Sequence, residues 1–430
     1  MLLLGTGLFL SLRCGFPQLR LRRVLHGTLG TLRRGGAGEP APGFSPFQAL
    51  STALAGTVGT GNIAGVAGAI LLGGPGAVFW MWAAALLGMG TKYAEIALAV
   101  RFRVFDEEGR PQGGPMYYIE RGLGPRFRPL AAAFALAGGL ASFGIGSLVQ
   151  SGEIAASAQL LFGLGPLAAG LATAALTAAV LLGGLKRIGR FTAALVPLMA
   201  GLYLLICLPV LILHAAELPG VFLLILRSAF GLRALGGGLA GWTMREALRQ
   251  GLARGLFSNE AGLGSAPMAH AAAACRSPRD QALWGVLEVL IDSFVICSLT
   301  AFVVLLSGIW RSGHTGGFSS PGGAAAEAFR LLLPGPLGGK AVSLCLLFFA
   351  LSSIIGWGCY GEICWSWLLR GRKEARLAFR LLFSLACLIG ALGPGDRIWA
   401  AADALNGLMA FPNLLALLLL SNTAAALSRG

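Results

Sequence analysis

Runs of apolar residues, each of the length that crosses a lipid bilayer as a helix, recur along most of this chain. A helix needs about 20 apolar residues to cross a hydrocarbon core of about 30 Å. Because the backbone must satisfy its own hydrogen bonds in lipid, these runs predict helices, so we expect an all-α integral membrane protein. We expect about eleven segments, at 1–12, 48–73, 76–100, 129–164, 166–185, 191–214, 252–275, 281–309, 341–369, 377–393 and 398–421.

Composition supports one transmembrane domain over residues 1–430. Only 12% of the residues are charged and 56% are apolar, whereas a soluble domain is about 25% charged. The first segment is too short to span the bilayer at about 1.5 Å per residue. We therefore interpret residues 1–43 as part of an extra, longer helix followed by a basic cytoplasmic loop.

The net charge of +15 would suggest a nucleic-acid partner in a soluble protein. Here the positions of the charges matter more. If the first residue is outside, 23 Lys and Arg residues lie inside and nine lie outside. This asymmetry predicts an outer N-terminus and a cytoplasmic C-terminus in a bacterial-type plasma (inner) membrane. Basic loops facing anionic lipid explain the charge, so we expect membrane lipid as a partner and no nucleic acid.

Two apolar segments contain helix-breaking clusters, AGTVGTGNIAG at 55–65 and FSNEAGLGSAP at 257–267. Glycine costs about 1 kcal/mol in a helix interior and proline about 3 kcal/mol. Such clusters are tolerated at membrane depth only where the backbone faces protein or a water-filled cavity. Close helix packing through small residues is an alternative, but it does not explain Asn62, Asn259 and Glu260. We therefore predict two broken helices.

The two broken segments lie five segments apart. This spacing predicts a five-plus-five inverted repeat, with residues 44–214 as the first repeat and 240–421 as the second. At 240–254, Arg and Glu recur at helical spacing between apolar residues, which predicts an amphipathic helix at the membrane surface.

A helix break at mid-membrane exposes backbone N–H groups on one side and carbonyl groups on the other. The N–H end attracts a carboxylate, and the carbonyl end attracts Na⁺ or an ammonium group. Glycine at the break lets a ligand reach the backbone, because no Cβ intervenes. A zwitterionic amino acid together with sodium suits such a site.

Six stretches of this chain resemble the alanine or glycine:cation symporter family: 47–95, 142–150, 184–190, 253–273, 283–303 and 402–421. The resemblance covers nearly the whole chain. It implies a leucine-transporter-like fold with one extra N-terminal helix. It also implies sodium-coupled uptake of alanine, glycine or a close relative, with Na⁺ as the coupling ion and no other cofactor.

The first break also resembles the Val-Gly-x-Gly-Asn stretch of neurotransmitter:sodium symporters, here at 58–62. The resemblance implies that the N–H groups of Thr60 and Gly61 hold the substrate carboxylate and that the Thr57 carbonyl holds its ammonium group. The implied sodium ligands are the carbonyls of Ala55 and Val58 and the hydroxyls of Ser352 and Ser353.

The resemblance places further residues around the substrate. Asn259 and Gly262 would line the pocket, with Ser258 nearby, and Gln150 and Trp357 would close it. A tryptophan wall limits side-chain size, which favours alanine or glycine. The alternatives are a lipid-interface anchor for Trp357 and an interhelical hydrogen bond for Gln150.

Carboxylates at membrane depth are candidates for function. Asp292 follows Glu288 by four residues on one helix face, and Glu260 lies in the second break. We expect structural or gating roles for Asn62, Glu260 and Asp292, with Glu260 capping free N–H groups; proton coupling is the alternative. Ser147 and residues 151–153 depart from the family pattern, so the transported amino acid stays open.

Rival functions have less support. The four histidines are dispersed and no metalloprotease or nucleophile-elbow motif occurs, which argues against a membrane enzyme. No repeated selectivity-filter sequence occurs, which argues against a channel. A proton-coupled carrier is the closest alternative to a sodium symporter, and the sequence does not fix the oligomeric state.

Overall fold

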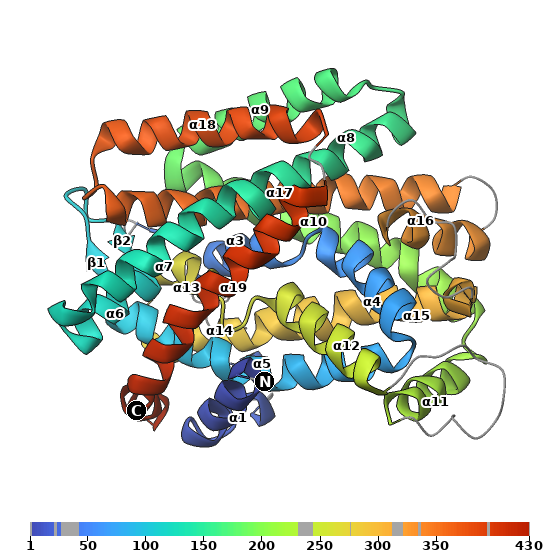
Figure 1. Cartoon of the computed structure of the whole chain (residues 1–430), viewed down its shortest axis with the longest axis horizontal. Coiled ribbons are helices and arrows are strands. Elements are labelled where there is room, and N and C mark those ends of the chain that lie inside the picture. The colour runs from blue at the N-terminus through green and yellow to red at the C-terminus, as the bar shows by residue number, and fades with distance from the viewer. Residues whose placement is uncertain are drawn as a thin grey trace.

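The computed structural model is mostly helical, and it describes residues 2–20, 24–26, 43–230, 244–275, 277–311, 321–333, 337–393 and 396–429. Most helices run along the longest axis of the molecule, and α19 (Asp396–Leu419) crosses them steeply (Figure 1). Near the chain ends, α1 (Leu2–Arg13) packs against α20 (Ser421–Arg429).

The remaining elements follow one another with short connections. Up to residue 230 they are η1 (Pro17–Leu19), α3 (Pro46–Thr57), η2 (Gly61–Gly65), α4 (Val66–Gly73), α5 (Gly76–Arg101), β1 (Val104–Phe105), β2 (Pro111–Gln112), α6 (Pro115–Leu123), η3 (Pro125–Phe127), α7 (Arg128–Ala141), η4 (Ser142–Leu148), α8 (Val149–Phe162), α9 (Pro166–Leu182), α10 (Gly184–Leu213) and α11 (Leu218–Ala229). After it they are α12 (Met244–Asn259), α13 (Ala266–Ala271), α14 (Pro278–Val289), η5 (Leu290–Cys297), α15 (Ser298–Ser307), α16 (Pro321–Leu332), α17 (Leu337–Leu368) and α18 (Lys373–Ala391).

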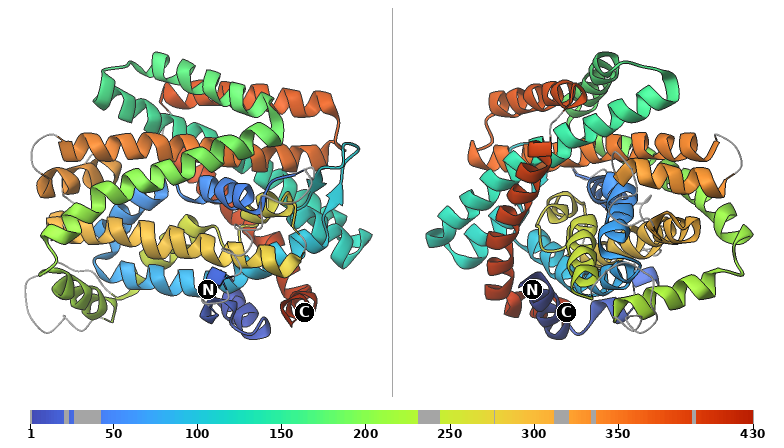
Figure 2. Two further views of the ribbon diagram at one scale, coloured as in Figure 1. Left: turned by 180° about the vertical axis from the view of Figure 1, so that it is seen from behind. Right: turned by 45° about the vertical axis from the view of Figure 1, so that its right-hand side comes forward.

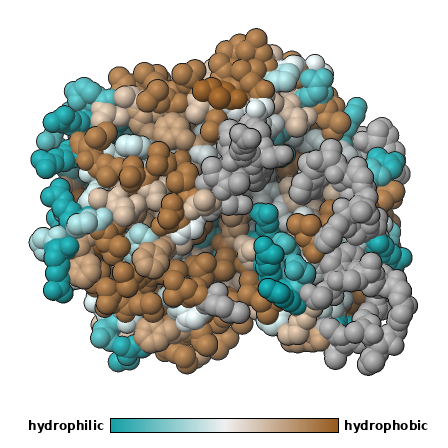
Figure 3. All heavy atoms as spheres, viewed as in Figure 1, coloured by the Kyte–Doolittle hydropathy of each residue, from teal (hydrophilic) through white to brown (hydrophobic). Residues whose placement is uncertain are grey.

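Every predicted apolar segment overlaps at least one of these helices. Within the described ranges, five continuous helical stretches are long and apolar enough to cross a membrane, or up to seven if each of two bent pairs counts as one span. Apolar side chains cover much of the face in Figure 3, and hydrophilic ones gather at its left edge, near β1, β2 and α6. The number of spans stays a prediction.

Two long helices organise the interior, α5 and α17. The most apolar stretch of each is 83% buried inside the protein. Helix α5 packs against α12, α14 and α1, whereas α17 packs against α8, α10 and α3. Figure 2 shows the broken pairs α3–α4 and α12–α13 enclosed by longer helices. The core therefore places both breaks between α5 on one side and α17 on the other.

The structure departs from the sequence predictions in the connections. A two-stranded antiparallel hairpin, β1–β2, and the short helix α6 lie within the polar connection at 101–128. Helices α11 and α16 lie in regions where we predicted no helix. The predicted surface helix at 240–254 is wrong for its described part: residues from Met244 onward belong to α12, which continues to Asn259 and packs on α5. Residues 240–243 lie outside the described ranges.

Candidate functional site

The first helix break begins where α3 ends, at Thr57. Helix α3 and the η2–α4 stretch meet at an angle of 53°. The Gly59 N–H donates a hydrogen bond of 2.9 Å to Asn62 Oδ1, so a side chain replaces the helical bond that is lost at the glycines. The break predicted at 55–65 is confirmed.

Helix α17 brings two serine hydroxyls to this break. Ser352 Oγ donates to the Val58 carbonyl at 3.4 Å and to the Phe349 carbonyl at 2.8 Å. Ser353 is 1% exposed, and its Oγ has no hydrogen-bond partner among the described residues. A buried polar group without a partner costs about 1–3 kcal/mol. Ser353 is therefore a buried oxygen at the break that a ligand would satisfy.

The glycines of the break bring its backbone close to α17. A Cβ on Gly59 would lie 2.3 Å from Ser353 Oγ, and a Cβ on Gly356 would lie 3.0 Å from the carbonyl carbon of Ala55. Side chains at these glycines would force the helices apart. The structure thus brings Val58 to Ser352 and places Ala55 and Ser353 in the same contact region, as the resemblance implies.

Helix α8 approaches the break with Gln150. The Thr60 hydroxyl donates to Gln150 Oε1 at 3.2 Å, and both side chains are buried. The interhelical hydrogen bond considered as an alternative role of Gln150 is thus present, and it joins two residues of the predicted pocket. Thr57 Oγ1 donates back to the Ala53 carbonyl at 3.2 Å.

Gly61 has free space that Gly59 lacks. A Cβ on Gly61 would meet only the Phe257 ring, at an ordinary contact distance of 3.6 Å. Packing of this conformation therefore does not by itself require glycine at position 61. This leaves access by a ligand as a reason for the glycine.

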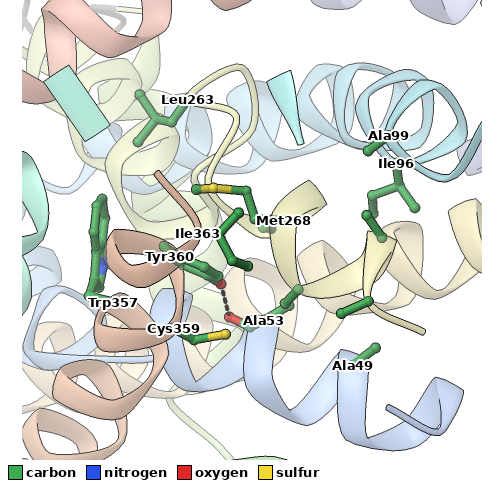
Figure 4. Packing of buried hydrophobic residues seen from close by; sticks show 14 of the residues in the cluster. Ala49, Ala53, Ile96, Ala99, Leu263, Met268, Trp357, Cys359, Tyr360 and Ile363 are labelled. Carbon is green, nitrogen blue, oxygen red and sulfur yellow. Dashed lines mark hydrogen bonds between the residues drawn. The ribbon is translucent and has the colours of Figure 1, made fainter. Parts of the chain in front are cut away.

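Trp357 lies one helical turn beyond Ser353 and is 2% exposed. A Cβ on Gly146 in η4 would lie 2.3 Å from the Trp357 Cβ, so the indole depends on a glycine opposite. Its ring meets Tyr360 edge to face at 5.6 Å, and Tyr360 points toward α3, where its hydroxyl donates to the Ala53 carbonyl at 3.4 Å (Figure 4). Burial inside the protein contradicts the lipid-interface alternative for Trp357.

Asp292 connects the two broken helices. Its carboxylate accepts hydrogen bonds from Asn62 Nδ2 at 2.6 Å, from Ser258 Oγ at 2.9 Å and from Ser293 Oγ at 2.8 Å. Asn62 Nδ2 also donates to Ser258 Oγ at 3.1 Å. All four side chains are buried. One carboxylate thus bridges η2 of the first break and α12 of the second, a geometry that fits the structural or gating role predicted for Asn62 and Asp292.

The second break is also present. Helix α12 ends at Asn259, and Glu260, Gly262 and Gly264 have φ angles of 54°, 90° and 82° before α13 begins. A positive φ is unfavourable for a side chain, so Glu260 is held in a strained backbone conformation. Its carboxylate accepts a hydrogen bond from the Ser265 hydroxyl, and its predicted capping of backbone N–H groups stays a prediction.

Two residues predicted to line the pocket face other neighbours. Asn259 Nδ2 donates to Ser293 Oγ at 3.4 Å, and its Oδ1 accepts from the Ala261 N–H at 3.0 Å. A Cβ on Gly262 would collide with Leu3 of α1 and Leu414 of α19. The recorded contacts of Asn259 and Gly262 therefore do not include Thr60 or Gln150, and their substrate roles stay predictions.

Sequence reasoning missed a buried ionic network behind the second break. Lys92 Nζ lies 3.1 Å from Glu288 Oε1, and His270 Nε2 lies 3.1 Å from Glu288 Oε2. Gln281 Nε2 lies 2.8 Å from His270 Nδ1. These groups fasten α5, α13 and α14 together. The available signal was a lone lysine within an apolar segment, which calls for a buried partner.

Similar sequences are known over nearly the whole length of the chain. The family described as the sodium:alanine symporter family matches residues 1–429. An uncharacterized transporter of Haemophilus influenzae is 46% identical, over 97% of this chain and 89% of that protein. The sodium/alanine symporter AgcS of Methanococcus maripaludis is 44% identical, over 98% of this chain and 91% of that protein.

Solved structures share the fold at low identity. MhsT in complex with L-phenylalanine matches with a TM-score of 0.60 and 16% identity, over 91% of this chain and 99% of that one. A Na⁺-coupled sialic acid symporter matches with a TM-score of 0.59 and 13% identity, over 96% and 85%. The arrangement of helices is thus that of leucine-transporter-fold proteins. The protein is a multi-pass membrane transporter, not an enzyme, and the chain belongs to the sodium:alanine symporter family.

Proposed function

We propose that the protein carries a small neutral amino acid, alanine or glycine, into the cell together with Na⁺ by alternating access. The observation that carries this proposal is the buried, unpartnered Ser353 hydroxyl beside the Val58 carbonyl and Ser352 at the first break. Carbonyl and hydroxyl oxygens suit a hard cation, and the break leaves the carbonyls at the end of α3 available. The printed function of AgcS supports the same solute pair.

The substrate site of this proposal adjoins the sodium site. The N–H groups of Thr60 and Gly61 would hold the carboxylate, and the Thr57 carbonyl would hold the ammonium group. Gln150 is positioned by its hydrogen bond to Thr60. Trp357, fixed against Gly146, would limit the space for the substrate side chain. The proposed topology is a five-plus-five inverted repeat with one extra N-terminal helix, an outer N-terminus and a cytoplasmic C-terminus.

The test is uptake of labelled alanine into proteoliposomes under an imposed Na⁺ gradient. Replacing Na⁺ by choline at constant pH should abolish accumulation; unchanged uptake would refute sodium coupling. A proton gradient without Na⁺ should not support accumulation, and if it does, the protein is a proton-coupled carrier.

The serine pair sharpens this test. Ser353→Ala removes a buried oxygen that has no protein partner, so the fold should keep its stability or gain slightly. The Na⁺ concentration for half-maximal uptake should rise about tenfold, equal to about 1.4 kcal/mol. Thr173→Ala is the matched control, because this buried hydroxyl is already bonded to the Ala169 carbonyl, at 2.8 Å. It should leave the Na⁺ dependence unchanged.

A further inference from the structure

Glu95 is a buried carboxyl group without a counter-ion of its own. It lies on α5 and is 0% exposed. One oxygen, Oε1, accepts a hydrogen bond from Asn413 Nδ2 of α19. The Gly262 backbone amide faces the carboxyl group, yet Oε2 makes no hydrogen bond with any described group. This carboxyl group is therefore only partly satisfied in the interior of the protein.

Glu288, in the same region, is fully compensated. Each of its two oxygens has a partner, Lys92 Nζ on one and His270 Nε2 on the other, both at 3.1 Å. Lys92 precedes Glu95 by one turn of α5, but its ammonium group is engaged by Glu288. A buried carboxylate needs pairing to offset the loss of its hydration. Glu288 meets this requirement as an anion and Glu95 does not.

We infer that Glu95 is a proton-binding site and that its carboxyl group carries a proton in this conformation. The charge of its surroundings supports this. The titratable groups that face it are Lys92 on α5, Glu288 on α14, Tyr118 on α6, and Glu260 and His270 around the second break. Lys92 is the one fixed cation among them, against two other carboxyl groups, so an ionised Glu95 would add a further buried negative charge.

The proton site acts on the second break through Asn413. Asn413 Nδ2 donates both to Glu95 and to the Gly262 carbonyl, the latter at 2.9 Å, and its Oδ1 accepts from the Tyr118 hydroxyl. Gly262 lies between α12 and α13. Ionisation of Glu95 would change the pull on this amide and therefore the geometry of the unwound stretch. Protonation thus favours the conformation described here, and proton exchange with water accompanies its opening.

The first experiment is thermal unfolding of the purified protein in detergent as a function of pH, which needs no assumption about the substrate. An acid that keeps its proton when folded and loses it when unfolded makes stability fall as pH rises above about 4.3, the pKa of a free glutamate. The fall stops where the buried group ionises. Relative to Glu95→Gln, which imitates the protonated form, the wild-type Tm should fall on the order of 2 °C per pH unit in this window.

The matched control is Glu288→Gln, which removes the same charge from the paired site. It should lower the Tm at every pH, since it leaves Lys92 unpaired, and should keep the wild-type pH dependence. Parallel Tm curves of Glu95→Gln and wild type would overturn the inference. Failure of Glu95→Gln to fold would overturn it too, because the near-isosteric neutral side chain would then be unable to replace a neutral carboxyl group.

Discussion

The two helix breaks are built from different kinds of groups. At the first break, neutral dipoles meet: the Val58 carbonyl, the hydroxyls of Ser352 and Ser353, and the Thr60–Gln150 pair. The second break is surrounded by ionisable side chains, among which Lys92, Glu288 and His270 form a closed buried network. Asp292 is the bridge between the two regions, through Asn62 and Ser258.

This difference assigns a different task to each break. Neutral oxygens bind a cation without a permanent protein charge competing for it, so the ion can be released again. A buried ion pair is costly to separate, because each charge would lose its partner in a low-dielectric interior. The first break is therefore suited to binding and release, and the second to holding α13 against α5 and α14.

The largest effect should come from breaking the ion pair at the second break. Lys92→Met leaves Glu288 with only His270 as a partner, and an uncompensated buried charge costs about 3–5 kcal/mol. The unfolding free energy, measured in mixed micelles, should fall by that amount. A loss below about 1 kcal/mol would show that the network does not hold the second break.

The double variant Lys92→Met/Glu288→Met provides the control for this prediction. It removes both charges and replaces them with apolar side chains of similar length. Its stability should lie well above that of Lys92→Met alone, since no unpaired charge remains. Equal instability of the two variants would point to lost packing instead of lost charge compensation.

Gly61→Val should act on the first break and leave the fold intact. The space next to Gly61 accommodates a Cβ, with Phe257 at 3.6 Å, but a branched side chain there would cover the N–H group proposed to hold the substrate carboxylate. Alanine affinity should fall by more than about 100-fold, near 3 kcal/mol, with a nearly unchanged Tm. Normal alanine binding by Gly61→Val would refute the backbone–carboxylate contact.

Gly59→Ala is the contrasting variant at the same break. Its Cβ would meet Ser353 Oγ at 2.3 Å, so this change should lower stability and raise the Na⁺ requirement together. The two glycines thus separate ligand access from helix packing within three residues of chain.

Local chain chemistry was enough to predict the breaks and the apolar segments. Glycine clusters with Asn and Glu inside apolar runs mark unwound helices whatever surrounds them. The start of α12 was predicted wrongly because an amphipathic half of a spanning helix and a surface helix share one periodicity. Only the neighbour decides, and here α5 covers one face of α12 while Arg245 and Arg249 stay exposed on the other.

Predictability of the site follows the same division. The resemblance supplied Val58, Ser352 and Gln150, and the structure brings each to the first break. The Lys92–Glu288 pair joins residues 196 positions apart, and a single sequence contains no signal that pairs them. The direction in which Asn259 and Gly262 face depends on the φ angles within the break, which residue types alone do not fix.

The smallest expected effect on alanine itself, and the sharpest test of selectivity at the first break, comes from Trp357→Phe. Alanine offers one methyl group, and a buried CH₂ contributes about 0.8 kcal/mol, so its affinity must come mainly from its charged groups. A smaller ring should change alanine binding only a few-fold while valine competes about tenfold better, since two further carbons gain space. Trp365→Phe is the matched control: Trp365 packs on Gly139 of α7 as Trp357 packs on Gly146, and its Nε1 donates to the Gly139 carbonyl at 3.2 Å. This control should alter stability but not the order in which alanine, valine and leucine compete for uptake of labelled alanine. If valine gains equally in both variants, or in neither, Trp357 is a packing residue and the size limit lies with Gln150 and its neighbours on α8.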